Sequence, residues 1–462
     1  GAVLAQAAQI DGKAAGLLEM AGLAQKGGAV QIHCRLAETP EDISAIRVAT
    51  GECDALIGGD LVVSDCLIDA PDAEDTGGVG ALYGTATVTD TDIDDAVATW
   101  AALGSPYGAV VADTVTIRDA AGYGVRTDDD GYAGGAIDLT DVRIDEVGSD
   151  AVRATEGDVD LDGVELYDAT VHGVRVDYGT LTATGSLFQA NGTTYSGGAV
   201  YALYGAVDIT SSTFQRNDGY EGGAIYAVSA SVTLDTVTFD ENEASVHGGG
   251  VFAESGDVSA TDCTFDSNDA SGGDGGGILA EEGDVALDGS TFTGNTAGGH
   301  GGALYVHTDG NTYIVDISGS TFDGNTAGDA GGALYFADQA LVSSDNVFRD
   351  NQAGATGGAI HIDGDLSTST DDTFCDQIAG SDGGAIHVES GGFDLRGGVL
   401  LENIASDDGG ALSALVATTS VHNTFMGNQA TSGAAILSEG GGSTEFNDNV
   451  VAFHTTLAAD ED

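Results

Sequence analysis

Short apolar runs with a period of two recur along most of this chain, separated by turns rich in glycine, aspartate and asparagine. Residues 222–242, for example, contain the runs AIYAV, VTL and VTF, in which apolar and polar positions alternate. This alternation and the many β-branched residues predict strands rather than helices. Only 3 prolines occur in 462 residues, so we expect few interrupted strands.

Two motifs alternate along the second half of the chain with a period of about 26 residues. The first motif, Phe-x-x-Asn or a close variant, begins at Phe188, Phe214, Phe239, Phe265, Phe292, Phe322, Phe348, Phe374, Leu400, Phe425 and Phe446. The second motif, Gly-Gly-Ala or a close variant, begins at Gly197, Gly222, Gly248, Gly275, Gly301, Gly331, Gly357, Gly383, Gly409 and Gly433. A motif that is repeated this often indicates an architectural unit rather than a catalytic site.

The repeat continues more weakly toward the N-terminus and gives about 16 copies in all. The equivalents of the phenylalanine in these earlier copies are Leu67, Ile93, Ile117, Ile144 and Leu166. Each copy has room for three short strands and for no helix, which predicts one turn of a parallel β-helix. In such a fold, one turn cannot bury its core face alone and depends on the next turn.

Stacked turns place equivalent residues over one another, so each position of the repeat forms a column. We expect the phenylalanines to form a buried aromatic stack and each following asparagine to occupy a turn, where its side chain can bond to the next copy. An apolar column in the Gly-Gly-Ala strand is predicted to face the core: Val200, Ile225, Val251, Ile278, Leu304, Leu334, Ile360, Ile386, Leu412 and Ile436. The paired glycines allow a tight turn before this strand.

A second column of the same strand has the opposite parity and is predicted to face outward. We call it the outward stripe: Tyr201, Tyr226, Phe252, Leu279, Tyr305, Tyr335, His361 and His387. Large planar side chains on an outer face are typical of interaction surfaces for sugars or proteins. The alternative is that they only fill a strand. The neighbouring His361 and His387 raise the further question of a metal site or a pH sensor, although two ligands without a third seldom hold a metal.

The alternation of Gly-Gly-Ala-Ile and Phe-x-x-Asn resembles the repeats of polymorphic outer membrane proteins, bacterial surface proteins, over residues 67 to 449. The resemblance implies a right-handed, single-stranded parallel β-helix in an all-β protein that acts as an adhesive surface passenger. It implies no catalytic residues. Members of that family often end in a membrane β-barrel, whereas this sequence ends in VVAFHTTLAADED. We therefore expect a processed passenger, a fragment, or a surface protein retained in another way.

The formal net charge is −63, from 12 basic and 75 acidic residues. Such a surface repels nucleic acid and anionic membranes, and it suits high salt or a setting rich in divalent cations. Aspartate-rich turns such as residues 267–277 lack the fixed ligand spacing of a calcium loop, so we expect at most loosely bound calcium and no other cofactor. No run of 18 apolar residues predicts a membrane-spanning helix.

The predicted domain organisation has three parts. Residues 1–54 lack the repeat, and residues 13–25 have helix-forming composition, so we expect a partly helical cap or an assembly segment; residues 55–450 form the β-helix, and residues 451–462 an acidic tail. The three cysteines Cys34, Cys53 and Cys66 are close enough in sequence for one disulfide in an oxidising compartment. Cys263 replaces the serine of other repeats and is expected to be a small buried residue.

These features favour a non-enzymatic extracellular or cell-surface protein, either an adhesin or a structural subunit of a fibre or coat. The expected partners are a host-cell, glycan or matrix surface, or further copies of the chain itself. The alternative is a carbohydrate-active enzyme, because parallel β-helices include lyases and hydrolases of polysaccharides. Such enzymes often combine carboxylates with a nearby cation, and cations are scarce in the second half of this sequence.

Overall fold

The computed structural model describes residues 30–33, 61–64, 67–69, 79–81, 84–94, 96, 100–128, 134–192, 194–308, 313–439 and 445–456. Every regular element within these residues is a β-strand. The strands form an all-β, right-handed parallel solenoid of about 14 turns, slightly fewer than the number of sequence repeats. Internal contacts divide the chain into two units, Gly1–Thr213 (unit 1) and Phe214–Asp462 (unit 2), which are described separately.

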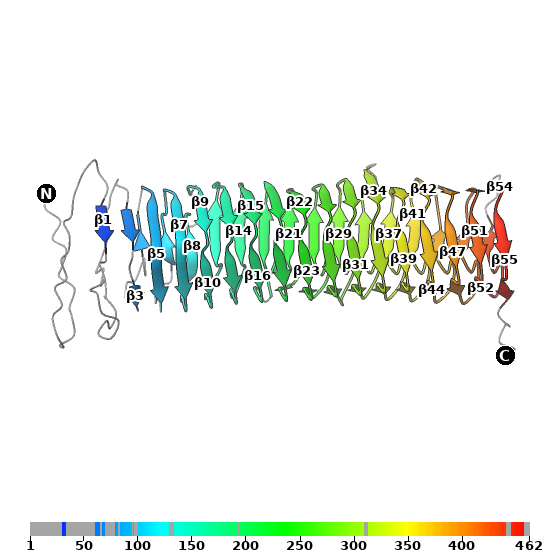
Figure 1. Cartoon of the computed structure of the whole chain (residues 1–462), viewed down its shortest axis with the longest axis horizontal. Helices are drawn as coiled ribbons and strands as arrows, with labels where there is room; N and C mark the ends of the chain where they lie inside the picture. Colours follow the sequence, from blue (N-terminus) through cyan, green and yellow to red (C-terminus); the bar gives the residue numbers. More distant parts are fainter. Residues whose placement is uncertain are drawn as a thin grey trace. The chain divides into compact units, whose positions relative to one another are not determined.

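A typical turn of unit 2 contains four strands rather than the three that the sequence predicts. One turn consists of β21 (Ile225–Val228), β22 (Ser231–Asp235), β23 (Thr238–Asp240) and β24 (Glu243–Ala244). Each strand pairs in parallel with its equivalent one turn later, as the succession of β-strands in Figure 1 shows. The fourth strand has only two residues, which is too short for an alternating pattern to reveal it.

We call the strands that follow the paired glycines, with their equivalents in earlier turns, the glycine sheet. In unit 1 its strands are β4 (Val79–Gly80), β6 (Ala101–Gly104), β8 (Tyr123–Arg126), β11 (Val152–Thr155), β14 (Val174–Asp177) and β17 (Val200–Leu203). In unit 2 they are β21 (Ile225–Val228), β25 (Val251–Glu254), β29 (Ile278–Glu281), β33 (Leu304–His307), β37 (Leu334–Ala337), β41 (Ile360–Asp363), β45 (Ile386–Val388), β49 (Leu412–Ala414) and β53 (Ile436–Ser438). The predicted core column is buried in every turn except the last, where Ile436 is half-buried.

The phenylalanine stack of unit 2 is confirmed. Phe214, Phe239, Phe265, Phe292, Phe322, Phe348 and Phe374 are fully buried, and neighbouring rings lie 4.6–5.1 Å apart with interplanar angles of 1–11°. Leu400 and Phe425 continue the column by strand register. Each ring therefore covers both faces with neighbouring rings, which buries a large apolar area in a narrow core.

The asparagines of the same motif form a ladder of side-chain amides in unit 2. Asn295 is typical: its Nδ2 donates to Asn325 Oδ1 (2.9 Å) and to the carbonyl oxygen of Phe265 (2.9 Å), and its backbone N–H also donates to Asn325 Oδ1 (3.0 Å). The same bonds recur along the ladder at Asn217, Asn242, Asn268, Asn325, Asn351, Gln377, Asn403 and Asn428. Gln377 differs in that its Nε2 donates to the carbonyl oxygen of Cys375. The ladder satisfies buried polar groups at the turn and fixes the register between turns.

The last sequence copy is placed differently from the prediction. Phe446 lies in β54 (Glu445–Asn447) opposite Ser420, and it is exposed rather than stacked. Val451 of β55 (Val450–Ala452) is the residue that lies opposite Phe425. The Phe446 motif therefore belongs to the preceding strand of its turn, which explains why its step from Phe425 was only 21 residues.

Unit 1 follows the same plan with aliphatic residues in place of phenylalanine. Strand register aligns Ile93, Ile117, Ile144, Leu166 and Phe188 in one column, as predicted. The first member of the column is Ile68 rather than Leu67, because Ile68 is the partner of Ile93. Two nine-residue strands, β5 (Ala86–Asp94) and β7 (Val110–Arg118), each span the length that two strands share in later turns.

The N-terminal region contributes one described strand within the predicted cap. β1 (Val30–His33) pairs in parallel with β2 (Leu61–Ser64), so residues 30–33 extend the sheet. The predicted helix at residues 13–25 lies outside the described residues, as do the side chains of Cys34, Cys53 and Cys66. The described residues contain no helix that is long and apolar enough to cross a membrane.

Cys263 is buried, as expected from its place in the repeat. Its backbone N–H donates to Ser290 Oγ (3.1 Å), and its thiol lies 3.2 Å from the carbonyl oxygen of Thr261, the place that a serine hydroxyl has in other turns. Burial raises the pKa of this thiol to about 11, so it is protonated at neutral pH.

The amide ladder makes a direct prediction for unit 2. Replacing Asn295 by alanine removes the two hydrogen bonds that its Nδ2 donates, and it removes the Oδ1 acceptor of the backbone N–H and Nδ2 of Asn268. We expect the free energy of unfolding to fall by about 2–4 kcal/mol, measured by denaturant titration followed by circular dichroism. The control is Thr296→Ala on the exposed side of the same turn, which should change stability by less than about 0.5 kcal/mol.

A buried carboxylate in unit 2 makes a second prediction. Asp372 is fully buried and accepts bonds from the Ser343 and Ser369 hydroxyls and from the Asn346 backbone, yet burial outweighs these bonds and raises its pKa. The folded state then binds the proton more tightly than the unfolded state, so this group weakens the fold as pH rises through its folded pKa. The Asp372→Asn variant should have a higher melting temperature than the parent at pH 8, and this difference should shrink as the pH is lowered toward 4. A difference in melting temperature that is the same at pH 8 and pH 4 would contradict this.

Candidate functional site

The outward stripe lies in the glycine sheet, at positions that alternate with the core column. In unit 2 its members pair in register from Tyr226 to His387. Ring centroids are 5.3 Å apart for Tyr305 and Tyr335, 4.6 Å for Tyr335 and His361, and 5.1 Å for His361 and His387. The stripe is thus a continuous stack of planar side chains over these four turns.

The stripe is less exposed than the sequence indicates. Phe252, Leu279, His361 and His387 are buried, with His361 only 4% exposed. Tyr201, Tyr226, Tyr305 and Tyr335 are half-buried, so only part of each ring contacts solvent. Strand parity alone predicts an outer position, but it does not predict what covers that position.

The segment before the paired glycines is what covers the stripe. The His300 ring lies 4.4 Å from the Tyr335 ring, and the Thr356 hydroxyl lies 2.8 Å from His361 Nδ1. The chain then turns back at a glycine with a left-handed backbone, such as Gly331 (φ 66°), where an added Cβ would lie 2.2 Å from the carbonyl oxygen of Leu334. The paired glycines therefore let the covering segment fold tightly onto the stripe.

Burial keeps the stripe electrically neutral. Desolvation, with smaller contributions from nearby carboxylates, raises the pKa of Tyr335 to about 12 and also raises the pKa of Tyr305. Burial and the neighbouring His387 and His300 lower the pKa of His361 to about 3. The phenols therefore remain hydrogen-bond donors, and His361 remains uncharged, across the physiological pH range.

The two stacked histidines each keep one buried nitrogen without a hydrogen-bonding partner. These atoms are Nε2 of His361 and Nδ1 of His387. Glu389 Oε2 lies 3.5 Å from His361 Nε2, which is too far or too misaligned for a hydrogen bond. Over the described part of the chain, no group of three histidines, cysteines or carboxylates is close enough to hold a metal ion, and this includes the aspartate-rich turn at residues 267–277.

In unit 1 the same column contains arginines, which the sequence reasoning missed. Strand register aligns Arg126 with Arg153, Arg153 with Arg175, and Arg175 with Tyr201. The signal was present in the sequence, because each arginine follows a valine of the core column by one position. The weak repeats of this region concealed that the three arginines share a column.

Aromatic rings and buried carboxylates hold these arginines in place. Asp128 is fully buried and accepts bonds from Arg126 Nε and Arg153 Nε, while Asp177 accepts from Arg175. The guanidinium of Arg126 lies 4.5 Å from the centre of the Tyr123 ring, and that of Arg175 lies 4.9 Å from the centre of the Tyr201 ring. We call Tyr123, Arg126, Arg153, Arg175 and Tyr201 the arginine–tyrosine ladder.

A histidine and a carboxylate form a pair at the edge of this ladder. Nδ1 of His172 lies 2.7 Å from Oδ1 of Asp150, and both residues are buried. The His172 ring lies 5.4 Å from the Tyr201 ring and 6.2 Å from that of Tyr195, which is exposed. The carboxylate fixes the orientation of the imidazole, which is the arrangement that an acid–base group requires.

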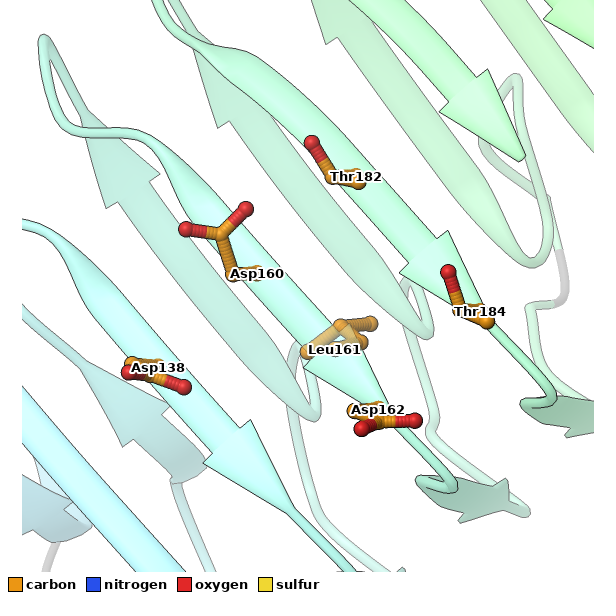
Figure 2. A pocket seen from close by; sticks show the side chains of 6 residues that line it. All are labelled: Asp138, Asp160, Leu161, Asp162, Thr182 and Thr184. Carbon is orange, nitrogen blue, oxygen red and sulfur yellow. The ribbon is translucent and has the colours of Figure 1, made fainter. Parts of the chain in front are cut away.

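Two hollows on the described surface of unit 1 are shallow and acidic. One in unit 1 has a volume of about 220 Å³ and is shown in Figure 2. It lies on the outer face of β9 (Ile137–Thr140), β12 (Val159–Asp162) and β15 (Thr180–Thr184). Its lining is Asp138, Asp160, Leu161, Asp162, Thr182 and Thr184. The second, of about 330 Å³, lies over the turns at residues 119–121, 146–148 and 168–170.

Comparison with known proteins gives one family match. The model of the right-handed beta helix region matches residues 109–272 and again residues 222–397, which together exceed half of the chain. No curated protein and no solved structure matches the sequence. The match agrees with the fold but does not distinguish the polymorphic outer membrane protein repeats from other β-helices.

His361 predicts an acid sensitivity of unit 2. Its folded pKa of about 3 lies below the usual value of 6.5, so the unfolded chain binds the proton more tightly between these values and stability falls as pH drops through that window. His361→Phe, which copies Phe252 of the same column, removes this loss. We expect the variant to gain about 2 kcal/mol relative to the parent between pH 7 and pH 5, measured by denaturant titration at constant ionic strength. A difference that does not change with pH would contradict the burial of a neutral histidine.

Proposed function

Since the chain belongs to the right-handed β-helix family, a fold that serves both binding proteins and enzymes, we propose that it is a non-enzymatic extracellular or cell-surface protein. In this proposal it acts as an adhesin or as a structural subunit of a surface fibre or coat. The polymorphic outer membrane protein repeats are the family whose motifs it resembles, and their adhesive role supports the same proposal.

The observation that carries the proposal is the rigid spacing of tyrosines along the outward stripe. Tyr305 and Tyr335 are stacked, half-buried and fixed by register, and their raised pKa values keep their hydroxyl groups protonated. A glycan or matrix surface offers repeated hydroxyl and carbonyl acceptors to such donors. Weak contacts that repeat on one rigid scaffold add to a useful avidity.

The test removes the hydroxyl groups and keeps the rings. Combined replacement of Tyr201, Tyr226, Tyr305 and Tyr335 by phenylalanine retains the rings, and Phe252 shows that this column accepts a phenylalanine. We expect attachment to a glycan or matrix surface to fall more than about tenfold, because each lost hydrogen bond contributes about 0.5–1.5 kcal/mol.

The matched control is Tyr178→Phe with Tyr204→Phe, two exposed tyrosines outside the stripe whose rings lie 5.1 Å apart. Attachment should survive in this variant, and the melting temperatures of both variants should stay close to that of the parent. If the four-tyrosine variant attaches as well as the parent does, the outward stripe is not the adhesive surface.

The second candidate function is an enzyme that acts on polysaccharides, and the His172–Asp150 pair favours it. An oriented imidazole beside Arg153 and Tyr201 provides a base, a cation and a stacking ring within one region of unit 1. Incubation with a panel of glycans separates the two proposals. Cleavage by the parent that is lost in His172→Gln, with an unchanged melting temperature, would replace the adhesive proposal by an enzymatic one.

A further inference from the structure

Three of the few arginines of this acidic chain lie together in unit 1, paired with buried carboxylates. Of 12 basic residues against 75 acidic ones, three arginines occupy one column on consecutive strands of the glycine sheet in unit 1. Arg126 is buried, but the side chains of Arg153 and Arg175 are 19% and 29% exposed. Tyr195, whose ring lies 6.2 Å from the ring of His172, is 57% exposed. Arginine and tyrosine are the residues that most often dominate protein interfaces.

The ladder is organised in advance for contact. Arg153 donates through Nε to the buried Asp128 and through Nη1 to the Tyr123 hydroxyl. Arg175 donates through Nε to Asp177, and its Nη2 forms an ion pair with the same carboxylate at 3.1 Å. Among the described residues, Arg153 Nη2 and Arg175 Nη1 have no hydrogen-bonding partner. The guanidinium groups are therefore held in fixed orientations with donors left over, which lowers the entropic cost of binding.

We propose that the arginine–tyrosine ladder docks onto the acidic outer face of β9 and β12 in a second copy of this chain. The proposal rests on the proposed structural role, and it names the partner of that role. Carboxylates are the groups that guanidinium donors recognise best. A second copy presents Asp138 and Asp160 in register on an outer face, beside the hollow seen in Figure 2.

The repeat distance favours a second copy over acidic partners that lack a β-sheet. Arg153 and Arg175 are paired in parallel register, and so are Asp138 and Asp160. Equivalent residues on neighbouring parallel strands lie about 4.8 Å apart, so both ladders have the same spacing. Two solenoids side by side can therefore match successive arginines with successive aspartates without distortion. An acidic chain that is not a β-sheet would have this spacing only by coincidence.

The net charge sets the conditions for this contact. Two copies of charge −63 repel at long range, and salt screens that repulsion before it weakens contacts at hydrogen-bond distance. We expect association to appear only as ionic strength rises. The two faces differ, so the contact is heterologous and each copy keeps one free face of each kind, which leads to open chains rather than closed pairs.

Sedimentation velocity of the full chain at about 0.01 M and about 1 M NaCl, where the Debye lengths are about 30 Å and 3 Å, tests the proposal. The parent should be monomeric at low salt and associate at high salt. Arg153→Gln with Arg175→Gln, and separately Asp138→Asn with Asp160→Asn, should each weaken association at least about tenfold. Arg349→Gln with Arg396→Gln removes the same charge from exposed arginines of unit 2 and should associate like the parent.

A mixture of the two interface variants provides the sharpest comparison. The arginine variant keeps its acidic face and the aspartate variant keeps its ladder, so together they should form pairs that neither forms alone. Because Arg153→Gln leaves the buried Asp128 with one partner fewer, Arg175→Gln alone is used if the double variant melts early, and the exposed aspartate variant is tested in every case.

A parent that stays monomeric at every salt concentration overturns the proposal, and so does an aspartate variant that associates like the parent. Arginine-dependent binding to an acidic glycan by a monomeric parent would assign the ladder to that ligand instead, and would also overturn it. These outcomes are separate from failure of the proposed function, which is measured as attachment by the tyrosine variants of the outward stripe.

Discussion

The interaction on which the rest of unit 2 depends is the hydrogen bond between side-chain amides of consecutive turns. A parallel solenoid with a narrow core must leave the strand direction at each corner, and the backbone groups of a corner cannot pair within the sheet. Asn295 and its equivalents satisfy these groups. The Oδ1 of Asn295 accepts from the backbone N–H of the preceding turn, and its own backbone N–H and Nδ2 donate to the side-chain amide of the next turn. Nδ2 also donates to a backbone carbonyl oxygen. With the corner fixed, the phenylalanines must lie over one another, and their rings stack 4.6–5.1 Å apart.

This fixed register also decides where chemistry is located. Because every position of the turn becomes a column, a change of residue type along a column creates a local site without any change of fold. The glycine sheet shows this within unit 1, where the column contains Arg126, Arg153 and Arg175 before Tyr201. In unit 2 the same column contains tyrosines and then His361 and His387. The covering segment before the paired glycines then sets how much of each side chain reaches solvent.

The fold was predictable from sequence because the repeat consists of residues that fit only particular backbone conformations or buried positions. Phenylalanine, asparagine and paired glycine each have one place in the turn, so their spacing gave the register correctly from Phe188 to Phe425. Phe446 was assigned to the wrong strand because the Phe-x-x-Asn motif also fits the preceding strand of the turn. Only the pairing of Phe446 with Ser420 distinguishes these two strands. The burial of His361 was missed because parity describes the strand, whereas the cover comes from Thr356 and His300. The arginine–tyrosine ladder was missed because its repeats lack the phenylalanine and glycine markers.

The most direct measurement of the central claim is the stability of a chain shortened by one whole turn. Deleting residues 325–350 joins Gly324 to Asn351, which is the next amide of the ladder, 26 residues further on. If the turn is the structural unit, this variant melts in one cooperative transition within a few degrees of the parent, roughly as expected for a stack of nearest-neighbour contacts. Deleting residues 325–337 removes half a turn and should abolish that transition. Equal damage from the two deletions would contradict the account.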